Sequence, residues 1–190
     1  MNYPNNIKKN NQKIVTYDNR GMDLENLINK TNEYYLDINR ALIYKKPTPI
    51  GIVEGNYKKI TNAYFKCPST LDYNGIYKGK YIEFEAKETK CKTSFPLQNI
   101  HEHQIIHIRK VLEHNGICFI IISMNGLIYL LNGKDFLNYI DTTQRKSIEY
   151  NYIKTTGHLL RETYNGLNYL DIIDNIYEGE LIWKIKKQLK

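Results

Sequence analysis

The sequence has few cysteines and no long apolar run. Its three cysteines, Cys67, Cys91 and Cys118, are an odd number, and their spacings match no zinc-binding or disulfide framework. They fit reduced thiols in a cytoplasm. The apolar run ICFIII is far too short to span a bilayer, and the first residues, MNYPNNIKKNNQK, lack the apolar region of a secretory signal. We therefore expect a soluble cytoplasmic protein with no membrane partner.

The composition is basic and rich in tyrosine. The chain has 190 residues, a formal net charge of +7 and 17 tyrosines. This length predicts one domain with a substantial core. Positive charge interleaved with aromatic residues favours a polyanionic partner, nucleic acid before an acidic membrane surface. An AT-rich genome would also raise the Lys, Asn, Ile and Tyr content, so the charge alone decides little.

The order of patterns along the chain predicts an α/β fold. We expect residues 1–18 to form a flexible basic arm and residues 19–190 to form a single domain. Residues 50–68 have a β-type composition and predict a hairpin that projects from the body. The other expected elements are helices at 21–37 and 98–114, a short strand at 41–46, strands at 117–124 and 126–132, and an amphipathic helix pattern from about residue 170.

The stretch YIEFEAKE, residues 81–88, alternates between apolar and charged side chains. Alternate residues of a strand share a face, so Glu83, Glu85 and Lys87 fall together. If Lys78 and Gly79 form a two-residue turn to the preceding segment, each step away from the turn adds one opposed pair. Asp72 then faces Glu85 with Cβ atoms ~5 Å apart, and Thr70 faces Lys87. A three-residue turn would shift these pairs.

Like charges that face each other repel, unless a cation lies between the carboxylates. Magnesium commonly takes one or two carboxylates together with phosphate oxygens and water. A lysine on the same face can stabilise charge on a phosphate under attack. The spacing Asp, a gap, then Glu-x-Lys resembles the PD-(D/E)xK nuclease superfamily. A second Glu-x-Lys begins at Glu88, but Glu88 would lie on the opposite face.

The segment 98–114 holds four of the five histidines and one glutamine of interest, Gln104. His103 and His107 are four residues apart and could chelate zinc, but no further ligand stands at a familiar spacing, so ordinary surface histidines are favoured. Gln104 shares a helical face with apolar residues, so its amide is expected to point inward. A buried amide needs partners, and its oxygen is an acceptable magnesium ligand.

Longer blocks resemble the RecU-type Holliday junction resolvases of low-GC Gram-positive bacteria and their wall-less relatives. The blocks are NRGMDLENLINKTNEYYL, KKPTPI, AYFK, STLDYNGIYKGKYIEFEAKETKCKTSFPLQNIHEHQ, GICFIIIS and RKSI, within about residues 19–150. The resemblance implies a restriction-endonuclease-like core: a mixed, five-stranded central sheet flanked by helices, with a projecting β stalk. It also implies a homodimer that binds four-way junction DNA.

The resemblance assigns roles residue by residue. It implies catalytic roles for Asp72, Glu85 and Lys87, and metal ligands at Thr70, Asp72, Glu85 and Gln104. The implied cofactor is Mg²⁺, with Mn²⁺ as a substitute. The implied activity is paired, symmetrical nicking of the junction in homologous recombination and DNA repair, with recombinase and branch-migration proteins as further partners.

Some features depart from the family pattern. The Pro-Asp of the superfamily is Leu71-Asp72 here, the segment 50–68 is shorter and less basic than a stalk is expected to be, and the resemblance fades after about residue 150. Two alternatives stay open: a general PD-(D/E)xK duplex nuclease, and a non-catalytic DNA-binding or recruiting protein with a nuclease fold. The residues expected to contact phosphate are Arg20, Lys45, Lys46, Lys58, Lys59 and Lys66.

Overall fold

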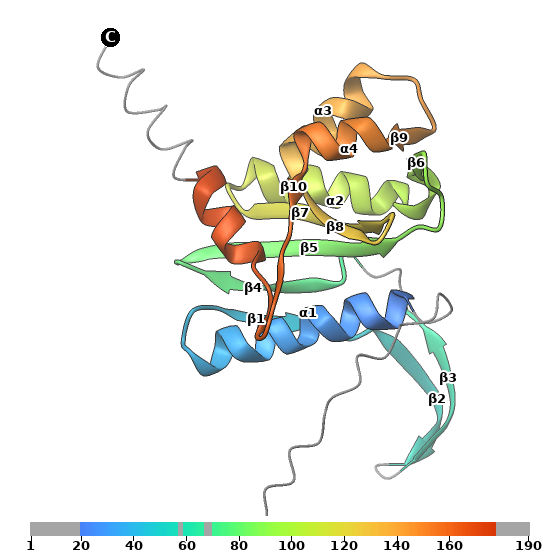
Figure 1. The fold of residues 1–190 in the computed structure, drawn as a ribbon. Coiled ribbons are helices and arrows are strands. Elements are labelled where there is room, and N and C mark those ends of the chain that lie inside the picture. Colours follow the sequence, from blue (N-terminus) through green and yellow to red (C-terminus); the bar gives the residue numbers. More distant parts are fainter. Residues whose placement is uncertain (1–19, 57–58, 67–69, 178–190) are drawn as a thin grey trace, which may run out of the picture.

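A six-stranded mixed sheet lies between helices on both of its faces (Figure 1). The computed structural model describes residues 20–56, 59–66 and 70–177, so the predicted basic arm lies outside the described residues. Only the pair β5/β7 is parallel in the sheet. The strands, in spatial order, are β1 (Leu42–Lys45), β4 (Tyr73–Tyr77), β5 (Lys80–Glu88), β7 (Ile117–Met124), β8 (Leu127–Asn132) and β10 (His158–Leu159).

This architecture confirms the predicted fold class, a mixed sheet flanked by helices. It corrects one detail, because the sheet has six strands rather than five. The additional strand is β10, whose two residues pair with Leu130 and Tyr129 of β8. It lies after residue 150, beyond the sequence blocks quoted above.

The helices divide between the two faces of the sheet. Helix α1 (Arg20–Asp37) and a helical segment at 169–177 share one core with the sheet. Helices α2 (Glu102–Glu113), α3 (Gly133–Thr142) and α4 (Tyr150–Thr156) share the other. The predicted helix at 98–114 is shorter than expected, because a 3-10 turn (Leu97–Asn99) precedes a new N-terminus at His101.

Strand β7 separates the two cores, as its continuous apolar run predicts. Ile121 packs toward the α1 side, whereas Ile120 and Ile122 pack toward the α2 side. All three side chains are fully buried. A strand buried on both faces needs apolar residues at every position, so periodicity of two disappears from its sequence.

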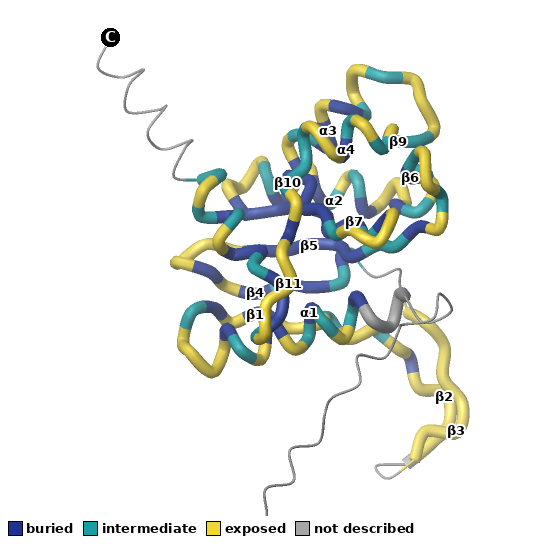
Figure 2. The backbone as a smooth tube through the Cα atoms, in the orientation of Figure 1, coloured by how far each residue is buried: buried dark blue, intermediate teal, exposed yellow. Residues whose placement is uncertain are grey.

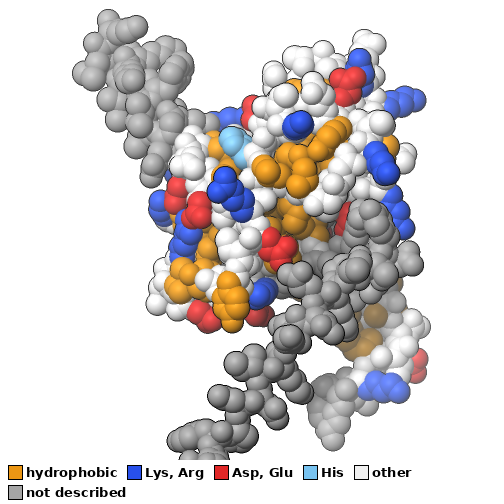
Figure 3. Space-filling model, in the orientation of Figure 1, with side chains coloured by type: hydrophobic (Ala, Val, Ile, Leu, Met, Phe, Trp, Pro, Cys, Tyr) orange, Lys and Arg blue, Asp and Glu red, His pale blue; other side chains and the backbone are white. Residues whose placement is uncertain are grey.

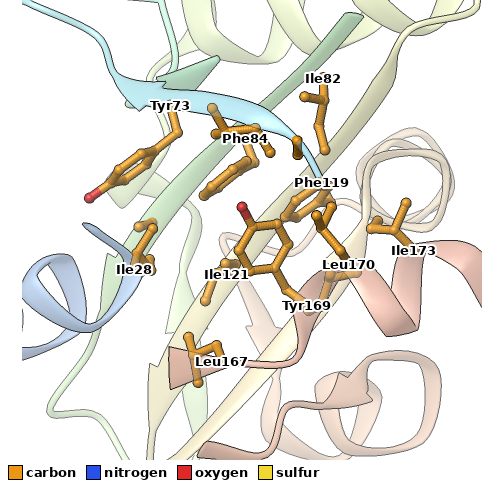
Figure 4. Close-up of a cluster of buried hydrophobic side chains, with 14 of the residues drawn as sticks. Ile28, Tyr73, Ile82, Phe84, Phe119, Ile121, Leu167, Tyr169, Leu170 and Ile173 are labelled. Carbon is orange, nitrogen blue, oxygen red and sulfur yellow. The ribbon is translucent and has the colours of Figure 1, made fainter. Parts of the chain in front are cut away.

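An aromatic stack fixes β4 and β5 to the centre of the sheet (Figure 4). The ring of Phe84 lies 4.9 Å from that of Tyr73 and 4.6 Å from that of Phe119, both nearly parallel. Tyr169 closes the cluster from the helical segment at 169–177. The sequence pattern predicted an amphipathic helix from about residue 170, and the side chains of Leu170 and Ile173 are buried in this core.

Strands β2 (Ile50–Asn56) and β3 (Lys59–Phe65) form a hairpin that projects from the body (Figure 2). Every residue of β3 is exposed. This hairpin occupies the position of the predicted stalk. Two further pairs, β6 (Ser94–Pro96) with β9 (Ser147–Glu149) and β11 (Glu162–Thr163) with β12 (Gly166–Leu167), close loops at the periphery. No helix within the described ranges is long and apolar enough to cross a membrane.

Candidate active site

The β4–β5 hairpin has the register that the two-residue turn predicts. Lys78 and Gly79 both have positive φ, 48° and 74°, as a tight hairpin turn requires. Tyr77 pairs with Lys80, and Tyr73 pairs with Phe84 at the far end of the ladder. The three-residue turn is therefore excluded. One step beyond the ladder, Asp72 comes level with Glu85.

Asp72, Glu85 and Lys87 lie together at that end of the hairpin. The backbone N–H of Asp72 donates to Glu85 Oε2 at 3.1 Å, and that of Ala86 donates to Asp72 Oδ2 at 3.4 Å. Lys87 forms an ion pair with Glu85, and its Nζ lies 3.8 Å from Asp72 Oδ2. The structure thus brings together the two carboxylates and the lysine that the sequence grouped.

The surroundings raise the pKa values of both Glu85 and Lys87. Burial, followed by the nearby charge of Asp72, raises the pKa of Glu85 to about 7, although Lys87 opposes the rise. Burial alone would lower the pKa of Lys87, but the charge of Glu85 outweighs it and raises that pKa. Two carboxylates held this close carry an excess of negative charge that a divalent cation would relieve.

Thr70 does not lie where the register places it. It was expected opposite Lys87, and this expectation is wrong because the ladder ends at Tyr73 and the chain bends before it. Leu71 turns into the core on the α2 side, where it is fully buried. The Thr70 hydroxyl instead donates to Glu83 Oε1 at 3.0 Å. Its role as a metal ligand stays a prediction.

Gln104 points inward, as predicted, and is almost fully buried. Its Nε2 donates to the backbone oxygen of Thr70 at 2.9 Å, and its Oε1 accepts from the N–H of His101 at 3.0 Å. The second bond is half of a capping box that begins α2. The amide therefore fixes the segment before Asp72 to this helix, and metal ligation by its oxygen stays a prediction.

The two carboxylates that could hold a metal ion are oxygen donors. In the described part of the chain, no group of three or more His, Cys, Asp or Glu side chains could hold a metal ion. Asp72 and Glu85 are the two carboxylates that meet, and both present oxygen. A hard cation that keeps several waters and takes phosphate oxygens suits such a pair.

The sequence analysis missed Glu83, which is fully buried beside this site. It forms an ion pair with Lys46, accepts from the Tyr81 hydroxyl at 2.8 Å and lies 2.6 Å from His107 Nε2. Burial alone would raise the pKa of Glu83, but the hydrogen bonds from Lys46, His107 and Tyr81 outweigh it and lower that pKa. The alternation placed Glu83 on the face of Glu85, but it gave no sign that α2 covers this position.

The residues expected to contact phosphate have different environments. Lys45 pairs with Glu25 on α1 at 2.5 Å, and the ammonium of Lys46 is shared between Glu83 and Thr70. Figure 3 shows Lys and Arg side chains on the hairpin and on both sides of the body. Lys59 and Lys66 are exposed, on and just after β3; the side chain of Arg20 and all of Lys58 lie outside the description.

Comparison with known proteins gives consistent matches. The family model described as "Recombination protein U" matches residues 19–175, so the expectation that the resemblance fades after about residue 150 is wrong. A Holliday junction resolvase RecU of Oceanobacillus iheyensis is 49% identical over 195 aligned residues, which cover 93% of this chain and 100% of that protein. A Holliday junction resolvase RecU of Bacillus cytotoxicus is 50% identical over 181 aligned residues, which cover 90% of each chain. A solved structure, the resolvase Hjc of Archaeoglobus fulgidus, gives a TM-score of 0.43 at 9% identity over 73% of this chain and 95% of that one.

Proposed function

This chain belongs to the RecU family, and on that premise we propose that it is an endonuclease that resolves four-way DNA junctions. The observation that carries the proposal is the group formed by Asp72, Glu85 and Lys87. It joins two carboxylates and a lysine at one end of a hairpin. Relatives that are about 50% identical to this chain are named Holliday junction resolvases, and the matches cover most of their length.

Asp72 and Glu85 are the residues proposed to hold Mg²⁺, with Mn²⁺ as a substitute. When bound, the ion would activate water and stabilise negative charge on the phosphate under attack. Lys87 would add a second positive charge at that phosphate, and its raised pKa keeps it protonated. Thr70 and Gln104, the further predicted ligands, hold the backbone that presents Asp72.

The substrate and assembly follow from the same proposal. Two active sites related by the symmetry of a homodimer would make paired, symmetrical nicks across the junction, one from each protomer. The exposed hairpin β2–β3, with Lys59 and Lys66 on or beside it, is the part proposed to contact the junction. Its described backbone extends beyond the sheet, as a junction-recognising element would require (Figure 2). Recombinase and branch-migration proteins are proposed as further partners, and the cytoplasm as the location.

A cleavage assay tests the proposal. A synthetic four-way junction with a mobile core and a linear duplex of the same arms are incubated with the wild type and Asp72→Ala, with Mg²⁺ or with chelator. We expect Mg²⁺-dependent paired nicks on the junction alone. Asp72→Ala should lower the rate by about 100-fold or more, whereas junction binding should stay within about twofold because lysines supply most of the affinity.

Asp141→Ala is the matched control, because Asp141 pairs with Arg109 on the surface. It should cleave like the wild type. Equal cutting of junction and duplex would favour the general nuclease instead. Tight junction binding without cutting, in Mg²⁺ and also when Mn²⁺ replaces it, would favour the non-catalytic recruiting protein. Loss of binding together with cleavage in Asp72→Ala would mean that the site is structural.

A further inference from the structure

The carboxylate of Glu83 is fully buried, and both of its oxygens accept hydrogen bonds. Oε1 accepts from the ammonium of Lys46, from the Thr70 hydroxyl at 3.0 Å and from the Leu71 backbone N–H at 3.4 Å. Oε2 accepts from Tyr81 at 2.8 Å and lies 2.6 Å from His107 Nε2. A carboxylate with this many partners has little capacity left for a metal ion. Its position two residues before Glu85 nevertheless places it beside the candidate active site.

The partners on Oε1 belong to the segment that leads into Asp72. Residues 70–72 lie outside the β4 ladder, so no regular strand pairing fixes them. Separate hydrogen bonds from other segments hold the polar groups of residues 70–72 instead. Glu83 holds Thr70 and Leu71, Gln104 holds the Thr70 carbonyl, and the Lys46 backbone N–H donates to the Asp72 carbonyl at 2.7 Å.

We propose that Glu83 is a positioning residue, which acts with Lys46 to place the Asp72 carboxylate against Glu85. Lys46 contributes twice, through its backbone to Asp72 and through its side chain to Glu83. The inference rests on the proposed nuclease function and extends it to two residues that do not touch the reacting atoms. Residues that orient a metal ligand through hydrogen bonds matter to the site although they do not touch the metal. Their substitution typically lowers metal affinity or activity by about 10- to 100-fold.

The same contacts give Lys46 a different role from the one its sequence position suggested. A lysine that contacts phosphate presents its ammonium to solvent, and its removal weakens binding. The ammonium of Lys46 lies between Glu83 and Thr70, in a side chain that is 22% exposed. Removal of Lys46 should therefore slow cleavage and leave junction affinity almost unchanged.

The test compares Glu83→Gln, Lys46→Met and the double variant in the full chain. Three quantities are measured: the single-turnover rate on a four-way junction at saturating protein, junction affinity in chelator, and the Mg²⁺ concentration at half-maximal thermal stabilisation. We expect each single variant to lose about tenfold or more in rate, with affinity within about twofold. The Mg²⁺ concentration at half-maximal stabilisation should rise by about tenfold. The fold-loss in rate of the double variant should be smaller than the product of the two single fold-losses, because both substitutions remove the same contact between Lys46 and Glu83.

Glu113→Gln is the control, because Glu113 pairs with Lys110 on the surface of α2. If Glu83→Gln fails to fold, Tyr81→Phe decides the matter. It removes one hydrogen bond to Oε2 from a partly exposed side chain and should lower the rate in the same direction. An unchanged rate and Mg²⁺ dependence in the folded variants would overturn the inference. A tenfold loss of affinity at an unchanged rate in Lys46→Met would also overturn it.

The Mg²⁺ readout separates the two hypotheses. If the wild type is stabilised by Mg²⁺ but cuts no junction, the proposed nuclease function fails. The positioning role of Glu83 is then still decided by the shift of the Mg²⁺ titration. If the wild type cuts and Glu83→Gln cuts equally well at equal Mg²⁺, the positioning role fails and the nuclease function stands.

Discussion

The buried carboxylate of Glu85 should make the metal-free protein less stable as the pH rises. Its pKa is raised from 4.5 to about 7, first by burial and then by the charge of Asp72. The folded state therefore holds this proton more tightly than the unfolded state does. The corresponding stabilisation is fully present below pH 4.5 and is lost as the pH rises to about 7. At 1.36 kcal/mol per pKa unit, the loss is about 3 kcal/mol.

Glu85→Gln removes this titration and so isolates it. Between about pH 4 and pH 8, the free energy of unfolding of the variant should fall by about 3 kcal/mol less than that of the wild type. Lys87 loses one partner but keeps Asp72, whose Oδ2 lies 3.8 Å from its Nζ. Urea denaturation in chelator at several pH values measures the difference. Glu149→Gln, on the surface beside Arg145, is the control.

Magnesium should reverse the loss at pH 8 in the wild type alone. A ligand at 100 times its dissociation constant stabilises the folded state by about 2.7 kcal/mol. Glu85→Gln, with one carboxylate fewer, should gain much less from the same concentration. Parallel pH curves for the two proteins in chelator would refute the reasoning, because they would mean that Glu85 does not titrate in this range.

Two further substitutions test the packing that supports the site. Phe84→Ala should lower the free energy of unfolding by about 3–5 kcal/mol, because it removes the ring stacked between Tyr73 and Phe119; urea denaturation measures the change. Gly75→Ala should cost about 1–3 kcal/mol and speed hydrogen exchange in β1, because a Cβ at this position would lie 2.0 Å from the backbone oxygen of Leu42.

The fold class and the central hairpin could be predicted because their determinants are local. Lys78-Gly79 fixes the turn, the alternation from Tyr81 onward fixes the faces, and the two together fix the register. The continuous run of β7 could be predicted for the same reason, since only a strand buried on both faces needs apolar residues throughout. The helix face of Gln104 followed from periodicity.

The positions that could not be predicted depend on contacts between distant segments. Thr70 leaves the register because Leu71 is buried against the α2 side of the sheet, and no local pattern encodes that bend. Lys46 is basic and directly follows a short strand, so its place in the sequence indicates a surface position. Its pairing with Glu83 depends on strand β4, which lies between β1 and β5 and pairs with both.

The β5 face presents two glutamates, and the balance of charge around each distinguishes their roles. Glu83 is matched by Lys46, so the pair is neutral and the Glu83 carboxylate can stay buried. Glu85 is matched by Lys87, but Asp72 adds a second carboxylate, so this group carries one excess negative charge when all three are ionised. A divalent cation is attracted to a group that carries excess negative charge, whereas a neutral ion pair exerts little net attraction on it. The alternation of YIEFEAKE therefore supplies both a metal site and its support, and the position of Asp72 decides which glutamate takes which role.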